Sequence, residues 1–314
     1  MSQESMNVNM IEAARDAQWD PVRFLGADYL RLIAPAKVNL FLGIGATRPD
    51  SRHNATTVMQ ALLLHDTLYM NVKHEAWQMP EDGTLPSWQA IGGPADNVLV
   101  TLDVVDKGTP LPLQGNASDN LVFRAVDALC REVASDQPMQ VNIRLEKSIP
   151  HQAGLGGGSS DAAAALVGMA KKLGVAPNGQ FVRTLSPLKA PIVLVKPAGG
   201  VSTAAAYHAF DEAPEAVPAE LLKQAESAES AEAVPLFNNL TAPAEQLLPE
   251  IAEVRAFLEA DPATTGCLLS GSGAAVFAIT ETAADALRLA AEAGKRGWWA
   301  RATSGSPLRA CAMG

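Results

Sequence analysis

The sequence predicts a mixed α+β protein built in two lobes. Three observations predict it: apolar runs of strand length alternate with amphipathic helical segments, a glycine-rich loop joins a strand to a helix mid-chain, and the composition changes after Gly174. The chain has 314 residues, of which 48% are hydrophobic, enough for one large domain or two ordinary ones. We place an extension at residues 1–28, a first domain at 29–190 and a second at 191–314, with the boundary between lobes near 175–200.

The first lobe contains most of the predicted strands. Apolar and polar residues alternate from residue 29 to 45, which predicts a strand that Pro35 ends or bulges. The apolar run at residues 56–64 fits either a strand or a helix. Further strands are expected at residues 67–72, 98–105 and 141–145. A helix is expected at residues 119–133, where Asp119 is the N-cap and apolar residues recur at helical spacing.

The second lobe combines short strands with alanine-rich helices. Strands are expected at residues 191–196, on each side of a Gly-Ser turn within 267–279, and at 298–302 as the last strand. Helices are expected from the turn at 199–203 through Tyr207, at 245–259 and at 282–294. The stretch 213–234, rich in Ala, Glu and Pro, is interpreted as a solvated helix or a linker.

Composition excludes several classes of protein. The net charge of −10 argues against general nucleic-acid binding, which needs a basic face. The three cysteines, Cys130, Cys267 and Cys311, form no CxxC pair, as expected in a reducing cytosol. No apolar run reaches the ~18 residues of a membrane helix, and the first residues lack the basic and apolar regions of a signal peptide. These features predict a cytoplasmic protein that binds neither nucleic acid nor membrane.

The central stretch at residues 150–166, PHQAGLGGGSSDAAAAL, follows a predicted strand and runs from a glycine-rich loop into an alanine-rich helix. Glycine permits tight turns with positive φ and a close approach of the backbone to a ligand. Ser159, Ser160 and Asp161 are expected to cap the helix, whose free N–H groups and dipole favour an anion. A mobile loop is the alternative, but the flanking strand and helix favour a phosphate-binding loop. The stretch has neither the lysine of a Walker loop nor the GxGxxG spacing of a dinucleotide-binding fold.

Two further positions suit a polar or anionic ligand. Lys37 lies inside an apolar stretch, where an unpaired ammonium is costly to bury. Either its stem is buried while its head reaches solvent, or an anionic ligand at the edge of the sheet pairs with it. His53 ends a polar turn and is either an exposed loop histidine or a ligand contact.

Four motifs in this order resemble those of the GHMP kinases, the relatives of galactokinase, homoserine kinase and mevalonate kinase. They are APAKVNL at 34–40, PHQAGLGGGSSDAA at 150–163, KP followed by GVST within 196–203, and LSGSG at 269–273. The first two together are most similar to the branch that phosphorylates a cytidylyl methylerythritol diphosphate in the non-mevalonate isoprenoid pathway. The resemblance implies a two-lobed α+β fold, with a ribosomal S5 domain 2-like first lobe, an α/β second lobe and ATP in the groove between them.

The resemblance also implies roles for individual residues. Lys37 is expected to act in catalysis between the attacking hydroxyl and the γ-phosphate, Asn120 to contact adenine, and Ser160 to touch Mg²⁺. The residues expected to bind the acceptor are Asn39, Arg52 and His53, of which the histidine reads the cytosine. The residues expected to wrap the ATP phosphates are Pro150, His151, Gln152, Ala153, Gly154, Leu155, Gly156, Gly157, Gly158, Ser159 and Ser160. The turn at 270–273 is expected to brace this loop from the second lobe.

The sequence departs from the family pattern in two places. Arg52 stands where the family has a tyrosine that stacks on a base, although an arginine also stacks on bases and binds phosphate. After Gly174 a few dozen residues of the pattern are missing, including the aspartate that is the presumed base for the acceptor hydroxyl. Asp161 belongs to the loop motif and is not expected to replace that base. Either the protein lacks this segment or the sequence at hand omits it.

We therefore expect a kinase that uses ATP and Mg²⁺ to phosphorylate the tertiary 2-hydroxyl of a small-molecule substrate, the cytidylyl methylerythritol diphosphate. Two alternatives stay open. One is a GHMP kinase for another small alcohol, which Arg52 weakly favours. The other is a nucleotide-binding relative impaired by the missing aspartate, since losing a general base costs on the order of 10²–10⁴ in rate. A homodimer is also left open.

Overall fold

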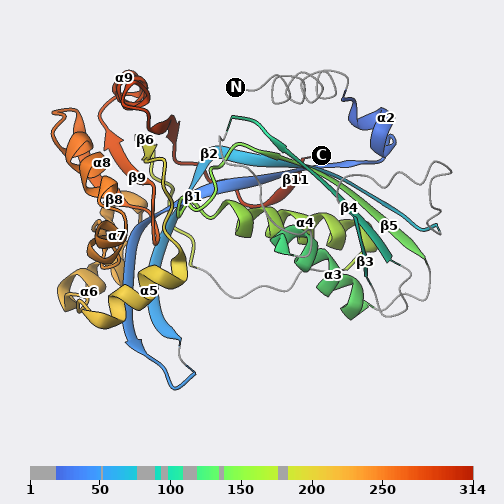
Figure 1. Cartoon of the computed structure of the whole chain (residues 1–314), viewed down its shortest axis with the longest axis horizontal. Coiled ribbons are helices and arrows are strands. Elements are labelled where there is room, and N and C mark those ends of the chain that lie inside the picture. The colour runs from blue at the N-terminus through green and yellow to red at the C-terminus, as the bar shows by residue number, and fades with distance from the viewer. Residues whose placement is uncertain are drawn as a thin grey trace, which may run out of the picture.

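The chain forms two lobes, each built on its own β-sheet (Figure 1). The computed structural model describes residues 19–50, 52–75, 89–92, 98–108, 119–133, 138–175 and 183–313. In the first lobe the strand order is β11-β1-β2-β5-β4-β3, and β7 is added beside β1. In the second lobe it is β10-β6-β9-β8. The two-lobed α+β fold predicted from the sequence is confirmed.

Two long strands form the hairpin on which the first lobe is built. Strands β1 (Leu30–Thr47) and β2 (His53–Lys73) pair antiparallel along their length, with a register shift between Pro35 and Lys37. Proline donates no hydrogen bond to a ladder, so Pro35 causes a bulge rather than the end of the strand. The ambiguous run at 56–64 belongs to β2. The remaining strands of this sheet are β3 (Gln89–Gly92), β4 (Val98–Asp106), β5 (Met139–Lys147), β7 (Phe237–Asn238) and β11 (Cys311–Met313).

Helices α3 (Leu121–Val133) and α4 (Gly157–Leu173) cover one face of this sheet (Figure 1). Fully buried side chains from both layers fill the space between them: Leu32, Leu68, Val126, Leu145 and Met169. The short helix α2 (Pro21–Leu25) lies in the predicted extension, of which residues 1–18 are outside the described residues.

Both helix starts in the first lobe differ from the prediction. The side chain that caps α3 is Asn120, not Asp119: its Oδ1 accepts from the backbone N–H of Val122 at 2.9 Å. Helix α4 begins at Gly157 after an N-cap glycine, Gly156, which has no side chain to offer. The predicted caps Ser159, Ser160 and Asp161 therefore lie inside the first turns of α4. A left-handed φ of 73° at Gly156 starts the helix before these residues are reached.

The second lobe packs helices on its own antiparallel sheet. The strands are β6 (Pro191–Lys196), β8 (Thr264–Leu269), β9 (Val276–Thr280) and β10 (Trp299–Ser304). The helices are α5 (Thr203–Glu212), α6 (Ala219–Ser227), α7 (Thr241–Leu247), α8 (Glu250–Glu259) and α9 (Ala283–Lys295). The single helix predicted at 245–259 is wrong, because Pro249 disfavours helical backbone at Leu248 and separates α7 from α8.

The two lobes are joined by a common buried core and by a strand that returns from the second lobe to the first. A third buried core joins them and includes Val38 of β1, Leu155 of the glycine loop, Leu194 of β6 and Phe277 of β9. The strand predicted at residues 298–302 is confirmed as β10, but it is not the last strand, because β11 follows it. Strand β11 returns to the first lobe, where Cys311 pairs with Ile33 of β1.

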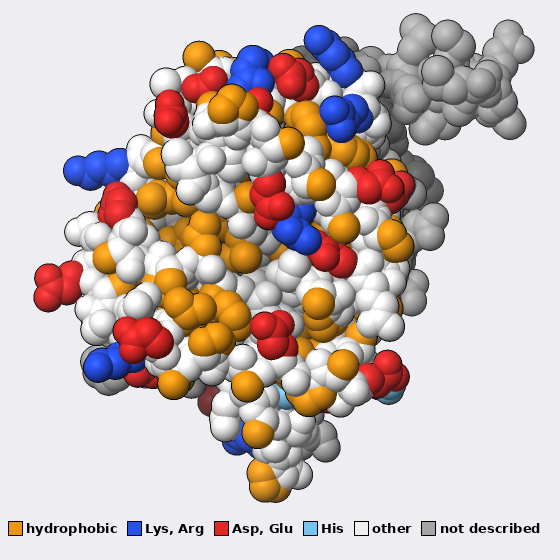
Figure 2. All heavy atoms as spheres, turned by 90° about the vertical axis from the view of Figure 1, so that its left-hand side faces the viewer, with side chains coloured by type: hydrophobic (Ala, Val, Ile, Leu, Met, Phe, Trp, Pro, Cys, Tyr) orange, Lys and Arg blue, Asp and Glu red, His pale blue; other side chains and the backbone are white. Residues whose placement is uncertain are grey.

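The outer face of the second lobe carries charges of both signs. In Figure 2 the Lys and Arg side chains on this face are interspersed with Asp, Glu and apolar side chains. No helix in the described part of the chain is long and apolar enough to cross a membrane.

Candidate active site

A cavity of about 960 Å³ opens between the lobes. The predicted residues that line it are Lys37, Asn39, Asn120, Pro150, His151, Gln152, Ala153, Gly154, Leu155, Gly156, Gly157, Gly158 and Ser159. Three predicted site residues, Arg52, His53 and Ser160, do not line it. A cavity of this size accommodates a nucleotide.

The glycines of the loop are needed where the backbone is left-handed and crowded. Gly154 has φ of 71°, and a Cβ added there would lie 2.0 Å from the carbonyl oxygen of Ser270. Gly156 has φ of 73°, and its Cβ would lie 3.0 Å from the Cγ of Lys37. Any side chain at Gly154 therefore collides with the second lobe, and any side chain at Gly156 with the lysine.

The second lobe braces the loop through hydrogen bonds, as the motif at 270–273 predicts. The hydroxyl of Ser270 donates to the carbonyl of Gly154 at 3.1 Å. The backbone N–H groups of Ala274 and Ala275 donate to the carbonyls of Gln152 and Ala153 at 3.2 and 3.0 Å. These bonds hold the loop, which runs into the start of α4, against the second lobe.

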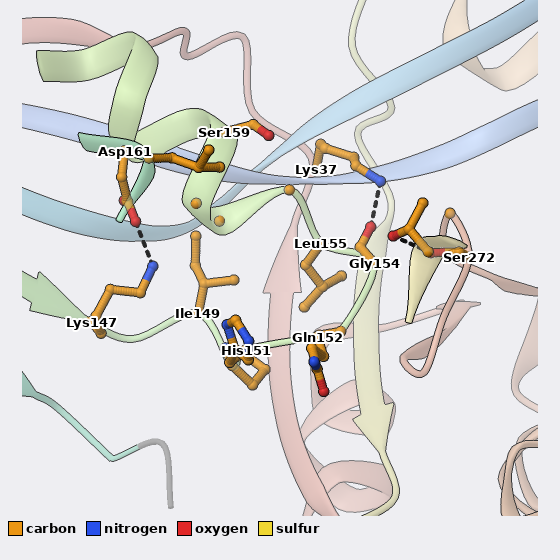
Figure 3. A pocket seen from close by; sticks show the side chains of 18 of the residues that line it. Lys37, Lys147, Ile149, His151, Gln152, Gly154, Leu155, Ser159, Asp161 and Ser272 are labelled. Carbon is orange, nitrogen blue, oxygen red and sulfur yellow. Dashed lines mark hydrogen bonds and ion pairs between the residues drawn. The ribbon is translucent and has the colours of Figure 1, made fainter. Parts of the chain in front are cut away.

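Lys37 points at the glycine loop rather than at bulk solvent (Figure 3). Its Nζ donates to the carbonyl of Gly154 and, at 2.6 Å, to Oδ1 of Asn39. The Nδ2 of Asn39 donates in turn to Thr57 at 2.8 Å, which fixes the orientation of the amide. Burial lowers the pKa of Lys37 to about 8. Asn39 thus holds the lysine in place, and its expected contact with the acceptor stays a prediction.

A buried ion cluster lies beneath the first turns of α4. Lys147, at the end of β5, donates to Asp66 of β2 and, at 2.6 Å, to Oδ2 of Asp161 (Figure 3). Asp66 also accepts from the backbone N–H groups of Ser148 and Ile149 at 2.6 and 2.8 Å. The cluster therefore ties β2, the start of the loop and α4 together. Asp161 is not a helix cap, because its carboxylate has a buried cationic partner.

Two carboxylates share one ammonium in this cluster, and the pKa values of Asp161 and Lys147 are shifted. Burial and, less strongly, the neighbouring Asp66 raise the pKa of Asp161. Burial alone lowers the pKa of Lys147, but the two carboxylates outweigh it and raise the pKa. The Oδ1 of Asp161 is buried without a hydrogen-bond partner among the described residues, although Asp161 lines the cavity.

Lys147→Met is expected to destabilise the protein by about 3–5 kcal/mol, because it leaves two carboxylates buried without their cation. Urea unfolding measures the change. The matched control is Arg288→Met, since Arg288 also pairs with several carboxylates but is 41% exposed. Its expected cost is below about 1 kcal/mol. Equal losses in the two variants would contradict a stabilising role of the buried cluster.

Apolar side chains line part of the cavity and are called the apolar slot here. They are Leu102, Val104, Leu121, Leu145 and Ile149, and Asn120 precedes one of them in the chain. These side chains suit the flat face of a purine. The Oδ1 of Asn120 caps α3, which fixes the orientation of its amide group.

His53 lies next to the cavity, behind Tyr207. The ring of Tyr207 lines the cavity, and the His53 ring packs against it with 5.2 Å between centroids. The Nε2 of His53 lies 2.7 Å from Oδ1 of Asp211 on α5. Arg52 is exposed in the turn between β1 and β2, where its backbone N–H donates to Asp50. The structure thus brings His53 close to the site and leaves Arg52 outside it.

Sequence reasoning missed several residues that line the cavity. They are Lys147, Asp161, Thr203, Tyr207 and Ser272. Thr203 and Ser272 are joined by a hydrogen bond of 3.0 Å between their hydroxyls. The GVST and LSGSG motifs contain these two hydroxyls, but their pairing is visible only in the fold.

Two lobes with a braced glycine loop and a buried lysine against it define a nucleotide-binding phosphotransferase. Residues 120–190 match the GHMP kinases N terminal domain, and residues 219–297 match the GHMP kinases C terminal domain. The chain belongs to the GHMP kinase family.

Individual relatives and solved structures agree with this assignment. The 4-diphosphocytidyl-2-C-methyl-D-erythritol kinase of Desulfitobacterium hafniense is 32% identical, covering 83% of this chain and 91% of that protein. The same-named kinase of Polaromonas naphthalenivorans is 32% identical over 78% of this chain and 84% of its own. A crystal structure of 4-(cytidine 5'-diphospho)-2C-methyl-D-erythritol kinase has a TM-score of 0.61 at 28% identity, covering 88% of this chain and 99% of that one. Homoserine kinase from Cytophaga hutchinsonii, at 14% identity and a TM-score of 0.56, shares the fold.

The alignments also bear on the segment expected to be missing after Gly174. The alignment with the Desulfitobacterium protein has 296 positions, whereas the 83% of this chain that it spans amounts to only about 260 residues. That relative therefore has a few dozen residues that face gaps in this chain.

Proposed function

We propose that the chain transfers the γ-phosphoryl group of ATP to the 2-hydroxyl of 4-diphosphocytidyl-2-C-methyl-D-erythritol. The observation that carries the proposal is Lys37, held against the glycine loop by Asn39 and Gly154 in the cavity between the lobes. The names of the relatives at 32% identity supply the acceptor. GHMP kinases use ATP as the phosphate donor, and the apolar slot suits its adenine.

The site's own groups suit phosphoryl transfer. The reaction passes through a loose transition state, so catalysis consists mainly of positioning and of charge stabilisation. The backbone N–H groups at the start of α4 bind the phosphates, and the Lys37 ammonium lies where it can neutralise charge on the group in transit. The bracing bonds from Ala274 and Ala275 keep the loop in one conformation.

The residues at the loop also fit Mg²⁺, which completes this reaction in many kinases. Mg²⁺ prefers oxygen donors, and it is commonly held by one or two protein groups together with phosphates and water. The hydroxyl of Ser159 and the unpaired Oδ1 of Asp161 are such donors, since both residues line the cavity at the start of α4, whereas the predicted metal contact, Ser160, does not line it. When bound, the ion would neutralise charge on the nucleotide phosphates.

One observation favours a second candidate, a nucleotide-binding relative with little turnover. Among the described residues, the carboxylates that line the cavity belong to Asp119 and Asp161, and the second is bonded to Lys147. No carboxylate of the described ion pairs contacts Lys37. The family's presumed base therefore has no counterpart beside the lysine.

Turnover with the cytidylyl acceptor tests the proposal. ADP release is coupled to a spectroscopic assay, and the product is identified by ³¹P NMR, with Lys37→Met as the inactive control. We expect a phosphorylated acceptor and one ADP for each acceptor consumed. ATP binding by calorimetry without acceptor-dependent ADP release would instead identify the impaired relative. Turnover of another small alcohol, but not of the cytidylyl acceptor, would contradict the proposed acceptor substrate.

His53→Ala is expected to raise the KM for the cytidylyl acceptor while leaving ATP affinity unchanged. The imidazole can pair with a pyrimidine edge, and it packs against the ring of Tyr207, a residue that lines the cavity. Calorimetric titration with each ligand in turn measures both affinities. Equal losses of affinity for the two ligands would mean that His53 has a structural role instead. An unchanged affinity for the acceptor would mean that the cytosine binds elsewhere.

A further inference from the structure

Three polar side chains meet where the β1–β2 hairpin of the first lobe reaches α5 of the second. The Nε2 of His53 lies 2.7 Å from Oδ1 of Asp211 and 3.2 Å from the hydroxyl of Thr47. That hydroxyl donates to the same carboxylate oxygen at 3.5 Å. The side chain of His53 is only 7% exposed, whereas that of Asp211 is 49% exposed.

Aromatic rings hold the imidazole on its other sides. The ring centroid of Tyr207 lies 5.2 Å from that of His53, and the ring of Phe210 lies 6.0 Å away, edge-on. All three partners on α5 are within one turn and a half of that helix. The orientation of the imidazole is therefore set by α5 as a unit.

The carboxylate of Asp211 decides which ring nitrogen carries the proton. An ionised carboxylate only accepts hydrogen bonds, so the Nε2 of His53 must be the donor. In a neutral imidazole the other nitrogen, Nδ1, then carries a lone pair and no proton. Nδ1 has no hydrogen-bond partner among the described residues. The ring thus presents an acceptor to whatever ligand reaches it.

We propose that Asp211 is a positioning residue that holds His53 as a hydrogen-bond acceptor and so makes the acceptor site select cytosine over uracil. This inference rests on the proposed function. The exocyclic amino group of cytosine donates a hydrogen bond, and a bare Nδ1 accepts it. Uracil has a carbonyl oxygen at that position, which would face the lone pair of Nδ1 without a proton between them. A site built around one hydrogen bond discriminates strongly against the analogue that cannot form it.

Asp211→Asn tests the inference, because an amide either accepts or donates and no longer dictates the tautomer. The matched control is Glu212→Gln, which removes the neighbouring carboxylate of α5 that pairs with the exposed His208 at 3.5 Å. Kinetics are measured with the cytidylyl acceptor, its uridylyl analogue and ATP. We expect Asp211→Asn to reduce the preference for the cytidylyl acceptor on the order of tenfold, mainly through KM. The kcat, the KM for ATP and all constants of Glu212→Gln should stay close to those of the wild type.

The ¹⁵N NMR shifts of the histidine give a readout that a merely structural contact would not move. In the wild type we expect the His53 signal of an unprotonated Nδ1, and in Asp211→Asn a mixture of tautomers. A proton on Nδ1 of the wild type would overturn the proposal. So would an equal rise of KM for both acceptors in Asp211→Asn, since it would mean that the pair only ties the hairpin to α5. Failure of the proposed function is seen separately, as absence of wild-type turnover with the cytidylyl acceptor.

Discussion

Replacing Lys37 by methionine is expected to lower kcat by about 10²–10³-fold while changing the KM for ATP little. The methionine keeps most of the apolar stem but removes the one ammonium that the structure holds against the carbonyl of Gly154. Charge on the transferring phosphoryl group then loses its stabilisation, while the backbone N–H groups of the loop still bind the ground state. Steady-state kinetics with both substrates measure the two constants.

A second buried lysine provides the control. Lys196 is 2% exposed and, like Lys37, donates to backbone carbonyls, here those of Pro197 and Gly199. It does not line the cavity. Lys196→Met is therefore expected to lower stability rather than kcat. A kcat unchanged in Lys37→Met, or lowered equally in both variants, would remove Lys37 from the mechanism.

The pH dependence should report the same lysine. Burial lowers the pKa of Lys37 to about 8, and the protonated form is the one that stabilises the phosphoryl group. We therefore expect kcat/KM for ATP, which reports the free enzyme, to fall as the pH rises through about 8. Bound phosphate favours the ammonium, so the corresponding limb of kcat should move to higher pH. A profile that stays flat until ordinary lysines titrate would contradict this assignment.

Gly156→Val is expected to weaken ATP binding by more than about 10²-fold while the protein remains folded. A β-branched residue resists the φ of 73°, and its side chain would enter the space of the Lys37 stem. The start of α4 must then shift away from the position that binds phosphate. Calorimetric titration with ATP, together with urea unfolding, measures binding and stability separately.

Gly174 offers a control with the same backbone strain and no collision. It has φ of 68° at the end of α4, and a Cβ there would meet nothing within 4 Å. Gly174→Val should therefore lower stability by about 1–2 kcal/mol and leave ATP affinity intact. Normal ATP affinity in Gly156→Val would mean that the glycine loop is not the phosphate site.

Local rules predicted the parts of the site that are local in the chain. The glycine loop could be recognised because the strand, the loop and the helix follow one another within about two dozen residues. Lys37 stood out because a lysine in an apolar strand needs a partner. The helix break at Leu248 is also predictable, since the residue before a proline avoids helical backbone. The amphipathic pattern of 245–259 instead favours one continuous helix.

Other features depend on residues distant in the sequence, and local rules failed there. Asp161 fits the pattern of a helix cap, yet a lysine on β5 and an aspartate on β2 enclose it, and burial of that cluster decides its role. Tyr207 lies between His53 and the cavity because α5 of the second lobe packs against the first-lobe hairpin. No spacing within either segment reveals that contact.

The return of β11 to the first lobe has a consequence for biosynthesis. Strand β1 leaves the ribosome near the start of translation, but two of its partners, β7 and β11, are made much later, the second at residues 311–313. The nascent first lobe must wait with one strand edge open, and such edges pair readily with other chains. Contacts of this sequence separation also slow folding. The first lobe therefore does not complete its sheet from residues 30–147 alone, and synthesis of residues 311–313, after the strands of the second lobe, supplies the strand that closes this edge.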